Sequence, residues 1–190
     1  MSKFTPEAVL SFWVDDIGPK GWYFGGDKID AKIRKRFRPL WDALMSDEYS
    51  DWGLSPKGAL ARIIVLDQFS RNMFRDSAKS FEADERALRF AGMAIQAGHD
   101  MEIPEPERQF FYLPYMHSED LDVQDQCVRL FESNTNNAEN LLHAKAHREV
   151  IARFGRFPYR NEALGRESSV EEADWMAQGG YKSVVDSVRG

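Results

Sequence analysis

The 190-residue sequence contains a single cysteine, Cys127. One thiol cannot form an internal disulfide, and it nearly excludes a zinc site built on cysteine. Its neighbours Gln126 and Val128 belong to an amphipathic helical pattern. A buried, inert thiol is therefore favoured over a nucleophile.

Long apolar runs are also missing. The apolar run at 63–66 is far shorter than the ~20 residues that a bilayer crossing needs. The first residues, Met-Ser-Lys-Phe-Thr-Pro, contain no apolar stretch suited to export. We therefore expect a cytoplasmic protein that does not associate with membranes.

Basic residues are outnumbered: 25 Lys and Arg face 31 Asp and Glu, which gives a net charge of −6. This balance argues against general binding to nucleic acid. Phosphate-binding glycine loops and nucleophile elbows are absent from the sequence. His143 and His147 have helical i,i+4 spacing but lack the glutamate of the zinc-protease motif, so we expect no metal and no cofactor.

What the sequence does contain is helical periodicity. Hydrophobic residues make up 43% and aromatic residues 13%, enough for a core. Helix starts are marked by Thr5-Pro6, by Ser55-Pro56, and by Ser168 and Ser169 before Glu171 and Glu172. Pro39 predicts a kink or an end in the helix that begins at Asp27. The pattern predicts an all-α fold of about seven to eight antiparallel helices, with one domain at 1–178 and a C-terminal tail at 179–190.

Two segments, 66–75 and 154–166, each combine Phe, Arg-Asn and a later Arg at a predicted helix end. Between residues 153 and 167 four arginines face only Glu162 and Glu167, a local charge of +2 in an acidic chain. Arginine stays charged, so these side chains are solvated, paired with acids, or available to an anion. The excess favours a site for a carboxylate or phosphate.

The candidate site is divided into two roles. His117 is the candidate general base and Glu119 the acid that orients it, although a structural histidine is the simpler interpretation. The alternative is that the Arg-Asn segments only lock loops, with Asp67 and Arg71 as a surface i,i+4 pair. The candidate ligand-binding residues are Asp67, Gln68, Arg71, Asn72, Arg156, Arg160, Asn161 and Arg166.

These segments, with the residues at 9–13, 107–119 and 154–168, resemble the bacterial domain-of-unknown-function family numbered 924. The resemblance implies an all-α, tetratricopeptide-like array and no particular activity. The sequence departs from the family pattern at Ser70, where Pro is common, and at Tyr159, where His is common. The second departure counts against any mechanism that needs a histidine in that loop.

Two functions remain open at this point. The first is a helical domain, or a cofactor-free enzyme, whose four polar segments meet in one cleft around a small anionic molecule. The alternative is a protein- or peptide-interaction module that uses a concave helical surface. The sequence leaves the oligomeric state and the existence of a reaction open.

Overall fold

The computed structural model describes residues 4–190, except for the side chain of Phe24. In this part of the chain the regular elements are all helices, joined by turns and loops, and it contains no strand. The all-α prediction is confirmed, whereas the tetratricopeptide-like order of the helices stays a prediction. The chain separates into two compact units, Met1–Pro114 and Tyr115–Gly190, and the domain boundaries expected from the sequence stay a prediction.

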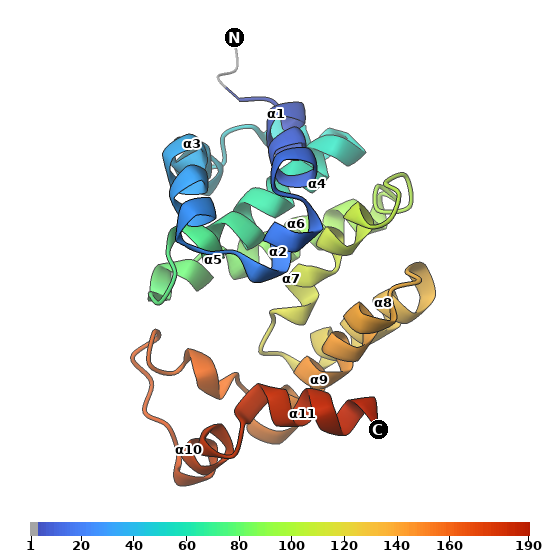
Figure 1. The fold of residues 1–190 in the computed structure, drawn as a ribbon. Helices are drawn as coiled ribbons and strands as arrows, with labels where there is room; N and C mark the ends of the chain where they lie inside the picture. The colour runs from blue at the N-terminus through green and yellow to red at the C-terminus, as the bar shows by residue number, and fades with distance from the viewer. Residues whose placement is uncertain (1–3) are drawn as a thin grey trace. The chain divides into compact units, whose positions relative to one another are not determined.

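Unit 1 is built from helices of very different length, which Figure 1 shows, and two of them are π-helices. Its 3₁₀ helices are η2 (Ser50–Leu54), η4 (Ala78–Phe81) and η5 (Glu107–Phe111). Its other elements are α1 (Pro6–Leu10), the π-helix η1 (Ser11–Ile17), α2 (Gly18–Phe24), α3 (Asp27–Met45), α4 (Pro56–Ile64), the π-helix η3 (Val65–Phe69), α5 (Ser70–Met73) and α6 (Asp84–Gln96). Helix α7 (Leu113–Met116) carries the chain into unit 2.

The expected helix starts are present in unit 1. The Thr5 hydroxyl accepts a hydrogen bond from the Ala8 N–H, and the Ser55 hydroxyl accepts one from Gly58, so both residues cap a helix whose first position is proline. The expected end of the helix at Pro39 is wrong, because α3 continues through it to Met45, and the alternative of a kink stays a prediction. Pro39 leaves only the carbonyl of the exposed Lys35 without its helical donor, and the buried face of α3 stays packed on the core.

Aromatic side chains form the core of unit 1. The Phe37 ring lies 5.0 Å from both Phe12 and Phe69, centroid to centroid, and Trp13 lies 5.3 Å from Phe69. All four side chains are at most 5% exposed. This core fixes the two π-helices, because Phe12 and Trp13 belong to η1 and Phe69 ends η3. The packing of Phe69 therefore also sets the positions of Asp67 and Gln68, the polar residues that precede it in η3.

Unit 2 contains α8 (Leu121–Asn134), α9 (Ala138–Phe154), the 3₁₀ helix η6 (Pro158–Arg160), α10 (Val170–Ala177) and α11 (Gly180–Arg189). Helix α9 packs against both α8 and α11, as Figure 1 shows. Asp120 caps α8, and Ser169 with Glu172 forms the expected capping box of α10. Cys127 is fully buried on α8, and burial raises the pKa of its thiol, as an inert cysteine requires.

The last segment differs from the expected tail, because residues 180–189 form helix α11. Tyr181 and Val184 of α11 pack on a buried cluster that includes Val150, Ile151 and Trp175. These contacts bury apolar surface, which stabilises the helical conformation of the segment. Among the residues described, no helix has the length and apolar character that crossing a bilayer requires.

Candidate functional site

In unit 1 the predicted ligand-binding residues lie along η3 and α5, where the helix widens to π spacing. π-Helical turns are rare and often occur at functional sites. Asp67 is 1% exposed, and its Oδ1 lies 3.1 Å from Nη1 of Arg71. The other nitrogen, Nη2 of Arg71, lies 3.0 Å from Oδ2 of Asp84. The guanidinium of Arg71 therefore lies between two carboxylates, those of Asp67 and Asp84. The side-chain amide of Gln68 also donates to Asp67, at 2.6 Å.

Asn72 takes part in a second buried pair. Its amide nitrogen donates to Oδ1 of Asp30 at 2.8 Å, and Nε of Arg75 donates to Oδ2 of the same carboxylate at 2.8 Å. The hydrogen bond to Asp30, which outweighs burial, raises the pKa of Arg75. These contacts join α3 to α5, so the polar segment 67–75 stabilises the packing of unit 1.

In unit 2 the candidate acid Glu119 is held by the 157–166 loop. Nη1 of Arg166 donates to Oε2 of Glu119 at 2.7 Å, and Nη2 donates to Oε1 at 2.9 Å. The backbone N–H of Phe157 also donates to Oε1, at 2.8 Å. Burial acts to raise the pKa of Glu119, but the hydrogen bonds from Arg166 and Phe157 bring it below its ordinary value. A carboxylate held in this way is a weak proton acceptor.

The neighbouring carboxylate, Glu172, is still more enclosed. Nε and Nη2 of Arg156 donate to its two oxygens at 2.6 and 2.7 Å, and the Ser169 N–H donates at 2.7 Å. Glu172 is 3% exposed, and the paired guanidinium of Arg156 lowers its pKa to about 2. Asn161 joins the two pairs, since its oxygen accepts from Nε of Arg166 at 3.0 Å and its nitrogen lies 3.4 Å from Glu172. We call Glu119, Arg156, Asn161, Arg166 and Glu172 the arginine network.

The remaining predicted residues of unit 2 are Arg160 and His117. Nη2 of Arg160 donates to the backbone carbonyl of His117 at 3.0 Å, and its guanidinium lies 4.4 Å from the centre of the Phe157 ring. Arg160 is only 6% exposed. These contacts are typical of an arginine that fixes a loop.

The predicted residues therefore fall into two groups, one in each unit. Asp67, Gln68, Arg71 and Asn72 lie together in unit 1, and His117, Glu119, Arg156, Arg160, Asn161 and Arg166 lie in unit 2. One cleft that contains both groups stays a prediction. The local excess of positive charge has a structural explanation, because Arg166 and Arg156 pair with Glu119 and Glu172, which lie outside the segment that was counted.

A histidine–tyrosine cluster in unit 2 was not expected. The Tyr181 hydroxyl lies 2.7 Å from Nδ1 of His143 and 2.9 Å from Nδ1 of His147. Burial lowers the pKa of His147 to about 3, so this ring is neutral at pH 7. The i,i+4 spacing of the histidines was visible in the sequence, but Tyr181 lies in the segment expected to be a tail. The cluster attaches α11 to α9.

Metal ligands are not gathered in this way. Within the described part of the chain, no group of three or more His, Cys, Asp or Glu side chains is arranged to hold a metal ion.

A region that the sequence did not indicate lies beside η1. Gly18 donates its N–H to the carbonyl of Trp13, five residues earlier, which is the π spacing. Phe12, Asp16 and Ile17 of η1 and Lys32, Lys35 and Arg36 of α3 line a hollow of about 650 Å³, which we call the α3 hollow. One feature of the sequence could have indicated this hollow: the charge of α3. Six cations and three acids lie between Asp27 and Met45, which gives the helix a net charge of +3.

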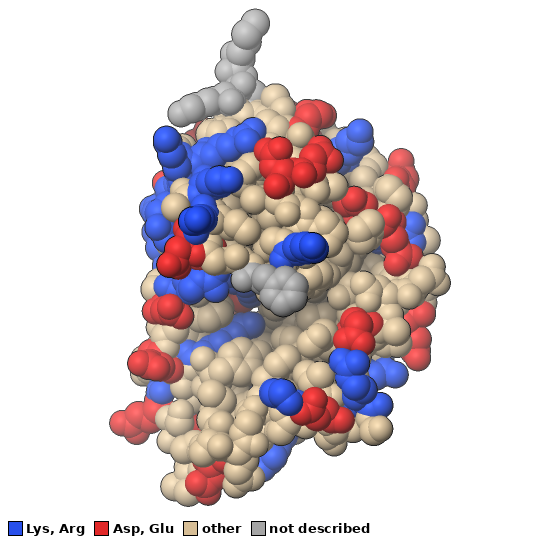
Figure 2. All heavy atoms as spheres, in the orientation of Figure 1, with Lys and Arg blue, Asp and Glu red and all other residues tan. Residues whose placement is uncertain are grey.

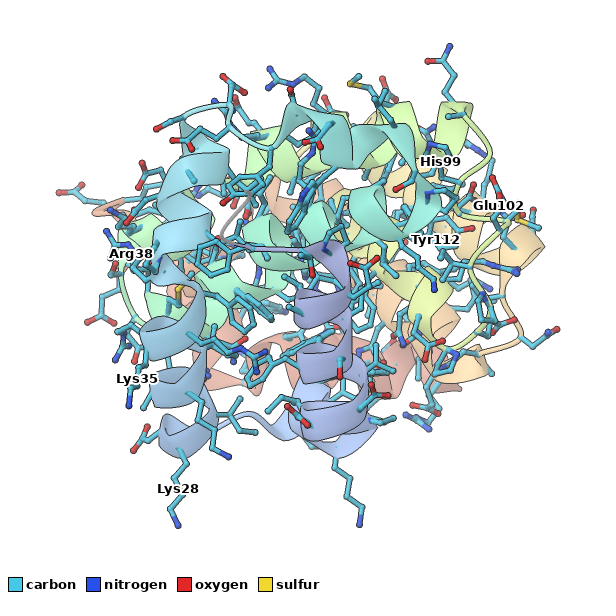
Figure 3. All side chains as sticks on the ribbon, turned by 90° about the horizontal axis from the view of Figure 1, so that it is seen from above. Lys28, Lys35, Arg38, His99, Glu102 and Tyr112 are labelled. Atoms are coloured by element: carbon cyan, nitrogen blue, oxygen red, sulfur yellow. The ribbon has the colours of Figure 1, made fainter. Side chains whose placement is uncertain are left out.

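The basic residues of α3 are exposed. Figure 2 shows the blue atoms of Lys and Arg gathered over α3, at the upper left. Figure 3 shows Lys28 and Lys35 extending away from the helix. Lys32 and Lys35 form no ion pair or hydrogen bond with any residue that the structure describes. Arg36 is only weakly paired, at 3.9 Å from Asp16, and lies 5.1 Å above the Phe12 ring.

These features define an all-helical protein in which acids such as Asp67, Glu119 and Glu172 pair with arginines, while unpaired lysines are exposed on α3. The family model described as a bacterial protein of unknown function (DUF924) matches residues 9–180, so the chain belongs to this family. A solved structure of a protein of unknown function from Agrobacterium tumefaciens is similar to it, with a TM-score of 0.87 and 36% sequence identity. The match covers 91% of this chain and 97% of that one. No curated protein matches the chain significantly.

Proposed function

We propose that the protein binds a small anionic molecule, and that the α3 hollow is the binding site. The observation that carries this proposal is the unpaired charge of Lys32 and Lys35 beside an apolar floor of Phe12 and Ile17. A ligand with one anionic group and one apolar ring would match both features, because pockets combine an apolar lining with a few polar groups.

The sequence-based alternative places the anion among Arg71, Arg156, Arg160 and Arg166, with His117 and Glu119 for proton transfer. Three of these arginines already donate to carboxylates of the protein, and an incoming anion would have to displace Asp84, Glu172 or Glu119. Leaving a partly buried carboxylate without its partner costs free energy, which favours the α3 hollow instead.

The expected affinity is modest. An exposed charge pair contributes about 1 kcal/mol at most, so three of them correspond to a dissociation constant of about 6 mM for inorganic phosphate. An aromatic ring of the ligand that enters the hollow beside Ile17 adds about 1–2 kcal/mol, because its own apolar surface leaves water. Phenyl phosphate should therefore bind with a dissociation constant of about 0.5 mM.

The test is thermal unfolding with 20 mM phenyl phosphate, with benzyl alcohol and sodium chloride as controls for the ring and for ionic strength. Phenyl phosphate should stabilise the protein by about 2 kcal/mol and raise the midpoint by roughly 4–8 °C. The double variant Lys32→Gln, Lys35→Gln should lose most of this shift. Lys20→Gln, which removes an exposed charge of unit 1 outside the hollow, should keep it.

Arg160→Ala separates the two sites, because the ligand-induced shift is measured from each variant's own midpoint. The proposal expects Arg160→Ala to keep the shift. A shift that survives the double lysine variant and disappears in Arg160→Ala would overturn the α3 hollow in favour of the sequence-based site.

A further inference from the structure

A second concave surface in unit 1 uses other residues of the same π-helix. Ser11, Val14 and Asp15 of η1 line it, together with residues of α1, α4 and the 103–107 segment. Its volume is about 350 Å³. We call this surface the acidic groove, and its lining consists of Glu7, Leu10, Ser11, Val14, Asp15, Lys57, Leu60, Ile103, Pro104 and Glu107.

The floor of the acidic groove is apolar. Leu60 is 1% exposed and Ile103 is 7% exposed, so both form the base of the groove. Leu10 and Val14 are half-buried and form one wall. Helices α1 and α4 pack directly on each other, which keeps the wall and the base together. The half-buried wall of Leu10 and Val14 still exposes apolar surface, and covering it with a partner's apolar side chains is favourable.

The rim carries unpaired negative charge. Glu7, Asp15 and Glu107 face a single cation, Lys57, which leaves a net charge of −2. None of these four groups forms an ion pair or hydrogen bond through its side chain with the residues described. This differs from the interior of unit 1, where Asp30, Asp67 and Asp84 are all paired with arginine.

We propose that the acidic groove binds a short helical segment of another protein, with apolar side chains on one face and lysine or arginine beside them. The apolar side chains would cover Leu10 and Val14 above the base of the groove, and the cations would pair with Asp15, Glu7 and Glu107. This inference goes beyond the proposed function, because it assigns a different ligand to a different surface.

A second copy of the chain fits the groove poorly. The basic helix α3 presents its cations to solvent, but its apolar residues, such as Phe37, Leu40 and Leu44, are buried in its own core. Two of the exposed apolar residues elsewhere, Met101 and Val170, stand beside the acids Glu102 and Glu171. The net negative charge of the groove therefore favours a partner whose apolar side chains stand beside lysine or arginine.

The probe is a labelled nine-residue peptide with lysine and leucine at helical spacing, titrated by fluorescence anisotropy against the full chain. Two matched peptides test its features: one replaces each lysine by glutamate, and the other replaces each leucine by serine. We expect the first peptide to bind with an affinity that falls as salt rises. Both matched peptides should bind at least tenfold more weakly.

Protein variants locate the binding. Asp15→Asn combined with Glu107→Gln removes two rim charges and should weaken binding about fivefold to tenfold, the effect of two exposed charge pairs. Asp16→Asn is the matched control, because Asp16 is the next residue of the same π-helix but lines the α3 hollow. It should leave the affinity within twofold.

Three results would overturn the proposal. They are no saturable binding of the lysine–leucine peptide, equal binding of the glutamate peptide, and equal weakening by Asp16→Asn. Concentration-dependent self-association that Asp15→Asn and Glu107→Gln abolish would assign the groove to a second copy instead. Each result is independent of phenyl phosphate binding, so failure here and failure of the α3 hollow are distinguishable.

Discussion

The arginine network of unit 2 differs from the two surfaces beside η1 in unit 1 in how its charged side chains are paired. In the network every carboxylate is aligned with a guanidinium, and Glu172 receives three hydrogen bonds of 2.7 Å or less. Beside η1, Lys32, Lys35, Asp15 and Glu107 have no ionic partner among the described residues. The network stabilises a loop, whereas the unpaired groups remain available to a ligand.

The difference follows from burial. A buried charge is tolerated only when it is paired and hydrogen-bonded, so composition that looks unusual in sequence can be required by the fold alone. An exposed charge is solvated and needs no partner, so the sequence does not distinguish a lysine that lines a site from any other surface lysine. Unusual residues therefore identified the network here, and ordinary lysines form the α3 hollow.

The largest effect should come from Glu172→Gln. This change leaves Arg156 without its carboxylate and weakens the capping box of α10, so we expect unfolding to become easier by about 2–3 kcal/mol. The measurement is urea unfolding followed by circular dichroism. Glu171→Gln is the matched control, because the adjacent Glu171 is exposed and pairs with the exposed Arg153. Glu171→Gln should change the free energy of unfolding by no more than about 0.5 kcal/mol. An equal decrease in both variants would show that the buried pair of Glu172 and Arg156 stabilises the protein no more than an exposed pair does.

A smaller effect should appear in the pH dependence of stability. The pKa of Glu172 falls to about 2 in the folded protein from an ordinary value of 4.5, so the folded state binds fewer protons than the unfolded state between these values. This contribution is fully present above pH 4.5 and is lost as the pH falls toward 2.

The free energy of unfolding, measured from pH 6 to pH 3, should therefore decrease toward acid in the natural sequence. Glu172→Gln should flatten this decrease, and Glu171→Gln should keep it. A decrease of the same slope in all three proteins would remove Glu172 as its source.

Local features were predictable from the sequence. Thr5, Ser55 and Ser169 each cap the helix expected of them, because a cap depends on residues within one turn. The helix does not end at Pro39, since the burial of the neighbouring apolar residues outweighs one missing hydrogen bond.

The environment of the candidate site was not predictable from local charge. Arg166 pairs with Glu119, 47 residues earlier, so a count over residues 153–167 could not include the partner. Helix α11 was missed for a similar reason, because Tyr181 is held by His143 and His147 from another helix. Contacts between distant segments decide which charges are neutralised.

The most direct test of the central claim is an amide nitrogen–proton NMR titration of the full chain with phenyl phosphate at constant pH and ionic strength. The account predicts saturable shift changes at Phe12, Asp16, Lys32, Lys35 and Arg36, with residues 156–172 unchanged. Saturable changes confined to residues 156–172 would contradict it, because they would show that the paired arginines bind the anion and the unpaired lysines do not.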